Sequence, residues 1–147
     1  PNLKLHGVTS AISILYQIGG KMKYKYVNLQ SKKYPMERGR CAVQAASLGM
    51  NMDFDMVFER FIDLIQARGL NVDPATEGMP IDLFEYWLIS NGWEKHGSLT
   101  RLDDLPDKGT FIVELSDHAT CVIDGVNLDF QDSRGRKVYC YFVISKT

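Results

Sequence analysis

Three side chains of types that together perform nucleophilic acyl chemistry are spread along the chain: Cys41, His118 and Asp132. A cysteine attacks a carbonyl carbon as its thiolate, and a neighbouring histidine takes the thiol proton and later gives it to the leaving group. A carboxylate on the other ring nitrogen of the histidine fixes its tautomer and orientation. We therefore predict that Cys41, His118 and Asp132 form a catalytic triad.

Cys41 begins an alanine-rich stretch, residues 41–49, that is typical of a short buried helix ending at Gly49. A thiol in the first turn of a helix lies near unpaired backbone N–H groups and the positive end of the helix dipole. Both favour the reactive thiolate. The amide of Cys41 is also a candidate donor to a developing oxyanion.

His118 and Asp132 flank a predicted β-hairpin. Two β-prone runs meet at Asp124-Gly125, a dipeptide that favours a turn with positive φ at both central residues. Such a hairpin brings His118, at the start of one strand, towards Asp132, just past the end of the other. Asp129 and Asp117 are rival carboxylates, although Asp117 adjoins His118 and adjacent strand residues point to opposite faces.

The rest of the pattern predicts an α+β fold, a single domain over residues 1–147 in which helices pack beside an antiparallel sheet. Residues 1–37 would supply an N-terminal arm, a strand and a loop, and residues 38–145 the core. Residues 1–20 are predicted to form a short helix or an irregular arm. The other segments expected are a strand over 21–30, a helix from about Asn51 or Asp53 to Arg68, a helix over 80–91, and loops over 31–39, 71–78 and 93–107.

Composition indicates an ordinary soluble domain. Of the 147 residues, 45% are hydrophobic and 24% charged, and the formal charge of −1 gives no support for binding nucleic acid or an anionic membrane. The apolar run over residues 8–18 is too short to span a bilayer. No targeting segment is recognised, so a cytoplasmic location is expected.

The three cysteines do not suggest a disulfide framework or a metal site. Cys41, Cys121 and Cys140 are scattered, and the three histidines have no paired spacing. We therefore expect a reducing compartment, no zinc and no cofactor. Cys121 and Cys140 are interpreted as buried strand residues with a packing role.

Taken together, these motifs resemble those of the papain-like cysteine peptidase superfamily. The motifs are GRCAV at 39–43 at a helix start, DHA at 117–119 opening a strand, and DSRG at 132–135 after the hairpin. The run DSRGRKVY at 132–139 is similar to one in small bacteriophage-type members. The resemblance covers residues 38–145 and supports Asp132 over Asp129, because members carry an Asn or Asp in this motif.

The resemblance implies a hydrolase that cleaves a peptide or isopeptide bond of a protein or peptide substrate through an acyl-thioester. Cys41 would be the nucleophile, His118 the general base and then acid, and Asp132 the orienting group. The location would be a bacterial host cytoplasm if the chain is phage-encoded. Members commonly carry an oxyanion glutamine about six residues before the cysteine, where this chain has Pro35. Gln30 and Gln44 do not match that position, so the side-chain donor is unassigned.

Two other functions are compatible with the same residues. One is a binding or inhibitory module that keeps the scaffold without turnover and acts on a host or virion protein. The other is a peptidoglycan amidase or endopeptidase, which shares the order of the triad.

Overall fold

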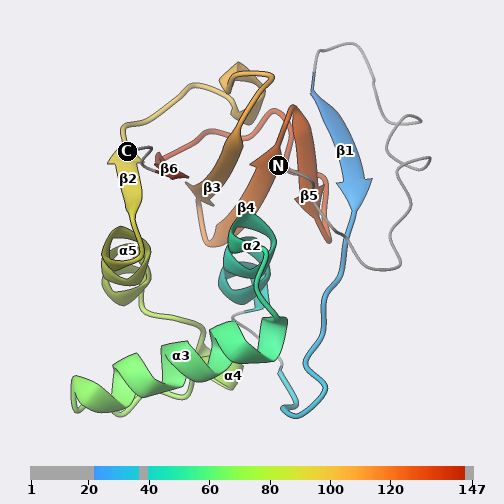
Figure 1. Cartoon of the computed structure of the whole chain (residues 1–147). Helices are drawn as coiled ribbons and strands as arrows, with labels where there is room; N and C mark the ends of the chain where they lie inside the picture. The colour runs from blue at the N-terminus through green and yellow to red at the C-terminus, as the bar shows by residue number, and fades with distance from the viewer. Residues whose placement is uncertain (1–21, 37–39, 145–147) are drawn as a thin grey trace.

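The computed structural model describes residues 22–36 and 40–144, so the expectation for residues 1–20 lies outside the described part. The helices are α2 (Arg40–Met50), α3 (Phe54–Ala67), α4 (Pro74–Glu77) and α5 (Ile81–Ser90), with a 3-10 turn η2 (Leu102–Asp104). The strands are β1 (Lys23–Tyr26), β2 (Trp93–His96), β3 (Thr110–Leu115), β4 (His118–Ile123), β5 (Val126–Asp129) and β6 (Cys140–Ile144). The predicted α+β class is confirmed (Figure 1).

The six strands form one sheet in the order β1-β5-β4-β3-β6-β2. The predicted hairpin is the β4–β5 pair, in which Ile123 faces Val126 across the turn. Asp124 and Gly125 have φ of 48° and 78°, the positive values that this turn requires. The prediction of an antiparallel sheet is wrong at one edge, because β1 pairs with β5 in parallel. Helices α2 to α5 all lie between these two strands in the described sequence, so no short turn constrains their relative direction.

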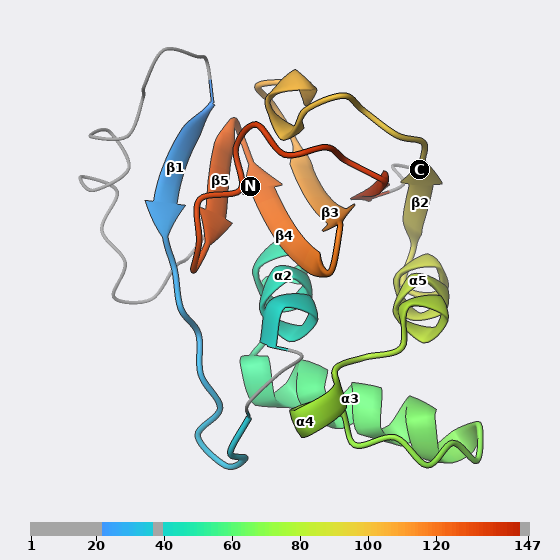
Figure 2. The ribbon, with the colours of Figure 1, turned by 180° about the vertical axis from the view of Figure 1, so that it is seen from behind.

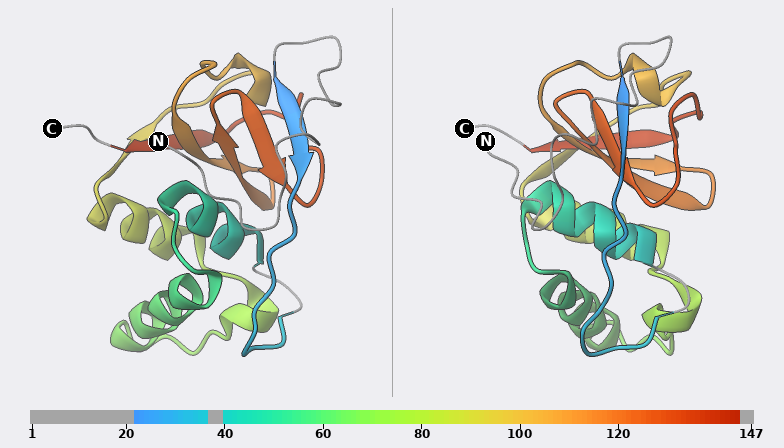
Figure 3. Two further views of the ribbon diagram at one scale, coloured as in Figure 1. Left: turned by 45° about the vertical axis from the view of Figure 1, so that its right-hand side comes forward. Right: turned by 90° about the vertical axis from the view of Figure 1, so that its right-hand side faces the viewer.

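The helices gather on one side of the sheet (Figure 3), where α2 packs on β4 and α3 lies farther out against α2 and α5. Asp53 begins α3 as predicted, since its side chain accepts a hydrogen bond from the amide of Met56. The prediction that Gly49 ends α2 is wrong by one residue. The helix continues to Met50, and Asn51 takes the positive φ of 55° that terminates it.

Two of the predicted loops contain regular structure. Residues 93–107 include strand β2 and turn η2, and residues 71–78 include the one-turn helix α4. β2 is an edge strand in which Trp93 alone is buried, so its sequence lacks the apolar alternation that marks a half-buried strand. The α4 turn begins at Pro74, a favoured first helical residue, with Asp73 as its cap.

The sheet has a hydrophobic core on each face. The core on the helix side contains residues such as Val43, Phe61 and Phe142. The opposite core includes Leu102 and Leu105, from the segment between β2 and β3 that is visible in Figure 2. Among the described residues, no helix has the length and apolarity needed to cross a membrane.

Candidate active site

Cys41 and His118, which are 77 residues apart in the chain, meet in the structure. Cys41 is the second residue of α2 and is partly exposed, and His118 is the first residue of β4. Cys41 and His118 line the same cleft, and the imidazole of His118 and the backbone of Ala119 act on the Cys41 sulfur strongly enough to lower its pKa. The predicted nucleophile and base therefore lie side by side, at the place where the first turn of α2 reaches the start of β4.

The carboxylate beside His118 is Asp129, not the predicted Asp132. Oδ2 of Asp129 lies 2.8 Å from Nε2 of His118. Asp132 instead forms a bidentate pair with the guanidinium of Arg134, with N···O distances of 2.9 and 2.7 Å. The third candidate, Asp117, is an exposed residue of the turn between β3 and β4.

The strand register explains why Asp129 reaches the histidine. Cys121 of β4 faces Leu128 of β5. Continuing that antiparallel register by one residue brings Thr120 opposite Asp129. Opposed residues share a face of the sheet, and His118 is on the same face as Thr120 because side chains alternate along a strand. Asp132 lies beyond the end of β5, outside this register.

Three neighbouring polar side chains hold the Asp129 carboxylate in place. The hydroxyl groups of Thr120 and Ser133 donate to Oδ2 at 2.5 and 2.8 Å. Asn127 connects these two donors, since its amide group donates to the Thr120 hydroxyl and accepts from the Ser133 amide. All are buried, and Asp129 is only 1% exposed. A buried carboxylate with this many donors is fixed in one position, which in turn fixes the imidazole ring.

The pKa values of Cys41 and His118 move towards an ion pair. Burial alone would raise the pKa of the Cys41 thiol, but the hydrogen bonds from His118 and the Ala119 backbone outweigh it, so this pKa is lowered. Burial alone would lower the pKa of His118, but its hydrogen bonds with Asp129 and Cys41 raise it to about 9. At neutral pH this favours a thiolate beside an imidazolium, the reactive form of such a pair.

The other two cysteines have the opposite character. Burial raises the pKa of Cys121 far above its usual range. Burial, together with the carboxylate of Glu114, raises the pKa of Cys140 to about 12. Both thiols are buried, so Cys41 is the one cysteine that combines exposure with thiolate character.

Phe130 covers the histidine from one side. Its ring packs edge-on against His118, with ring centroids 5.4 Å apart and an interplanar angle of 82°. The guanidinium of Arg40 lies over the same aromatic ring, 5.4 Å from its centroid. An aromatic ring in this position limits the access of water to the imidazole and its hydrogen bond with Asp129. Sequence reasoning missed this contact, although Phe130 directly follows Asp129.

A side-chain donor for an oxyanion is still not assigned. Gln44 is buried, and its side chain forms hydrogen bonds with the backbone of Leu29 and Val27. It therefore connects α2 to the segment that follows β1. Gln30 is exposed. The amide of Cys41 remains a candidate, because N–H groups in the first turn of a helix have no intrahelical acceptor.

Cys41 and His118 open onto a cleft of about 800 Å³. Its walls come from the start of α2, the segment between α4 and α5, and the first turn of α5. The end of β3, which includes Glu114, the turn after it and the start of β4 complete them. Met79, Ile81, Phe84 and Leu115 supply apolar surface, and Glu77 and Asp117 lie at exposed positions. A cleft of this volume is large enough for several residues of an extended peptide.

Comparisons of the chain with protein-family models, with curated proteins and with solved structures found no match.

Proposed function

We propose that this protein is a papain-like thiol hydrolase that cleaves a peptide or isopeptide bond. The observation that carries the proposal is the contact of Cys41 with His118 and of His118 with Asp129, at a cleft. A cysteine at a helix start, a histidine at a strand start and a carboxylate on the next strand are also the arrangement expected from the sequence resemblance. Asp129 takes the orienting role first predicted for Asp132.

The reaction begins with attack of the Cys41 thiolate on the carbonyl carbon of the substrate. The carbonyl oxygen becomes an oxyanion, for which the Cys41 amide is a donor. Collapse of this intermediate breaks the C–N bond, and the His118 imidazolium gives its proton to the leaving amine. The product of this half-reaction is an acyl-thioester on Cys41 and a free amine.

Water then completes the cycle. Neutral His118 removes a proton from a water molecule, which attacks the thioester carbonyl carbon. The C–S bond breaks, the acid product leaves, and the thiolate–imidazolium pair forms again. Throughout, Asp129 accepts a hydrogen bond from Nε2–H and so keeps the other ring nitrogen, Nδ1, directed to the sulfur.

Alkylation of the thiols tests the central feature of this proposal. Native protein treated with limiting iodoacetamide at pH 7 should be modified at Cys41 well before Cys121 or Cys140, as mapped by peptide mass spectrometry. His118→Ala should slow the labelling of Cys41, while His96→Ala, which changes an exposed histidine remote from this site in the sheet, should leave it unchanged. Equal labelling of the three cysteines in native protein would contradict the proposal.

Turnover must be tested separately, because a reactive thiol alone does not distinguish a hydrolase from a binding module. New amino groups released from a mixture of unfolded proteins would be measured for native protein and for Cys41→Ala. If the protein is a hydrolase, Cys41→Ala should abolish the release of amino groups. If it is a binding module, neither native protein nor Cys41→Ala should release amino groups, and the variant should keep the biological effect. Release of amines from purified cell wall, but not from protein, would favour the peptidoglycan alternative.

A further inference from the structure

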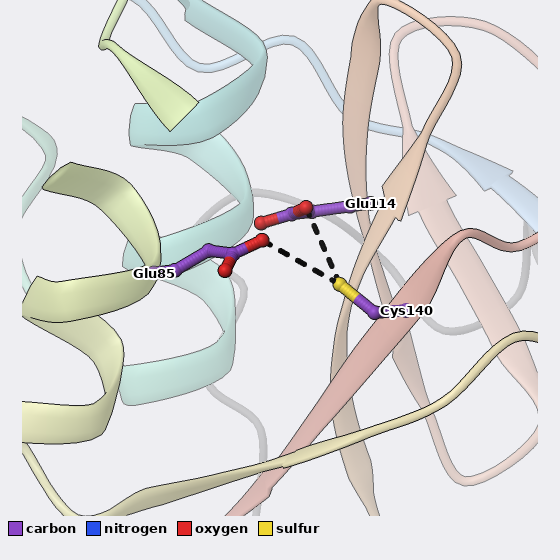
Figure 4. A group of neighbouring side chains, drawn as sticks. All are labelled: Glu85, Glu114 and Cys140. Carbon is purple, nitrogen blue, oxygen red and sulfur yellow. Dashed lines mark hydrogen bonds between the residues drawn. The ribbon is translucent and has the colours of Figure 1, made fainter. Parts of the chain in front are cut away.

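A second group of acidic and sulfur side chains lies between α5 and the sheet (Figure 4). Glu85 comes from α5, Glu114 from β3 and Cys140 from β6. The Cys140 sulfur is 3.3 Å from Oε1 of Glu114 and 3.9 Å from Oε2 of Glu85. One ligand atom from each residue lies within 4.8 Å of the other two. Three elements therefore bring three potential metal ligands to one point.

One oxygen of this cluster has no hydrogen-bond donor. Glu114 is 4% exposed, and its Oε2 atom has no hydrogen-bond partner within the described part of the chain. Figure 4 shows its carboxylate directed towards Glu85 and Cys140. The nearby ammonium group of Lys95 lies 2.8 Å from the other carboxylate of the cluster, at Oε1 of Glu85. A buried carboxylate oxygen without a donor is costly, so a positive ligand between the two carboxylates would stabilise the site.

We propose that Glu85, Glu114 and Cys140 bind a divalent metal ion, and that zinc is the ion that fits them best. Zinc accepts thiolate and carboxylate ligands in tetrahedral geometry, whereas calcium and magnesium prefer oxygen alone. With Zn–S near 2.3 Å and Zn–O near 2.1 Å, tetrahedral geometry separates sulfur from oxygen by about 3.6 Å. The two observed separations, 3.3 and 3.9 Å, lie on either side of this value.

The charges of the cluster also suit a divalent ion. With a metal ion bound, the two carboxylates and the Cys140 thiolate would carry three negative charges, and Lys95 contributes one positive charge. The remaining two negative charges are those that one divalent cation neutralises. A bound metal ion keeps a coordinating thiol deprotonated, so Cys140 would bind as its thiolate. Water would occupy the fourth coordination position.

The proposed ion would fasten α5 to the sheet. Glu85 follows Phe84, and Phe84 and Ile81 of α5 form part of the cleft wall beside Cys41. Fixing α5 at Glu85 therefore also fixes that wall. The metal site stands on its own geometry and does not depend on the proposed hydrolase activity.

Cobalt(II) gives a direct test, because its bond to a thiolate produces an intense near-ultraviolet absorption. The probe is Co²⁺ added to the full chain after dialysis against a chelator. We expect this absorption to saturate at one equivalent of Co²⁺ and to disappear when Zn²⁺ displaces the cobalt. Native protein that shows no thiolate–cobalt absorption, or shows it without saturation, would overturn the proposal.

Substitution of single residues identifies which thiol binds the cobalt ion. Cys140→Ser should abolish the absorption, and Glu114→Gln should weaken cobalt binding. The control variants Cys121→Ser and Cys41→Ser should retain the absorption. Loss of the absorption in Cys41→Ser with retention in Cys140→Ser would place the ion at the cleft and overturn the proposal. Zinc should also raise the melting temperature of native protein. If Cys140→Ser does not fold, the native titration and the Cys41→Ser control still decide the outcome.

Discussion

The identity of the third residue is the main correction at the scale of single side chains. Asp132 has the motif context, but its carboxylate is neutralised by Arg134 and is 44% exposed. Asp129 has the position that an orienting carboxylate needs, since it is buried and accepts hydrogen bonds from His118, Thr120 and Ser133. A hydrogen bond to a fixed, buried carboxylate orients an imidazole, whereas an exposed carboxylate paired elsewhere does not. The structure therefore assigns to Asp129 the contact predicted for Asp132.

Replacing each aspartate by asparagine separates the two assignments. Asp129→Asn removes the charge that favours imidazolium, so the pKa of Cys41 should rise and the pH profile of Cys41 alkylation should move to higher pH. At any pH below the pKa of Cys41 the rate should fall about tenfold for each unit of that shift, because the thiolate is the reactive form. Asp132→Asn, the matched control, should leave the profile in place. A shift in the Asp132 variant alone would restore the original prediction.

The thiolate–imidazolium pair of Cys41 and His118 also predicts how the rate of hydrolysis depends on pH. The pKa of Cys41 is lowered and that of His118 is raised to about 9, so the thiolate–imidazolium form persists between the two values. Hydrolysis should therefore fall above about pH 9, where His118 loses the proton that the leaving amine needs. Alkylation of Cys41 needs only the thiolate and should not fall there. Loss of hydrolysis already near the ordinary pKa of histidine would contradict this account.

At the scale of elements, α2 must lie close to the sheet to bring Cys41 to β4. Gly49 allows this approach. A Cβ atom added there would be 2.7 Å from Cγ1 of Ile112, which is itself fully buried in β3. The glycine expected to end the helix instead lies inside it, where its missing side chain makes room for the sheet.

Gly49→Ala should therefore destabilise the protein. Alanine favours a helix more than glycine does, but the overlap with buried Ile112 forces a local shift that costs about 1–3 kcal/mol. The free energy of unfolding would be measured by urea denaturation. Gly97→Ala is the control, because no atom lies within 4 Å of the added Cβ. Equal stability of the two variants would show that α2 can move away from β3 at little cost.

At the scale of the whole molecule, the two cores share a single sheet. The helix-side core holds α2 against β4, and the other core is closed by the segment containing Leu102. β4, which carries His118 and Thr120, contributes residues to both cores, and it pairs with β5, which carries Asp129. Loss of either core should therefore affect the sheet as a unit and, through it, the site.

Leu102→Ala tests this coupling from the face opposite the helices. Leu102 is 0% exposed, and removing its side chain should cost about 2–5 kcal/mol. Trp87 and Trp93 both belong to the helix-side core. Because one sheet connects both cores, the fluorescence of these tryptophans and the helix content measured by circular dichroism should be lost at lower urea in Leu102→Ala than in native protein. Leu70→Ala, at a residue that is 44% exposed, should have little effect. Unchanged urea midpoints for these helix-side signals in Leu102→Ala would show that the cores unfold independently.

Local patterns predicted helices α2, α3 and α5 and the β4–β5 turn, and they singled out Cys41 and His118, which the structure brings together. The apolar spacing predicted α3, and Asp124-Gly125 predicted the β4–β5 turn, because these signals act between near neighbours in the chain. Cys41 and His118 were found from their types and positions at a helix start and a strand start. The hairpin register also contained a signal for Asp129, since it sets this residue opposite Thr120 on the face of His118.

The tertiary structure decided the features that depend on pairing between distant segments. The parallel β1–β5 pair, the polar edge strand β2 and the approach of Ile112 to Gly49 each join segments with no local signal for one another. The cluster of Glu85, Glu114 and Cys140 has no motif spacing, because its members come from three elements that meet only on folding. Sequence by itself determined which side chains could react. Folding determined which carboxylate reached the histidine, because burial and strand register, rather than motif, set the distance between their atoms.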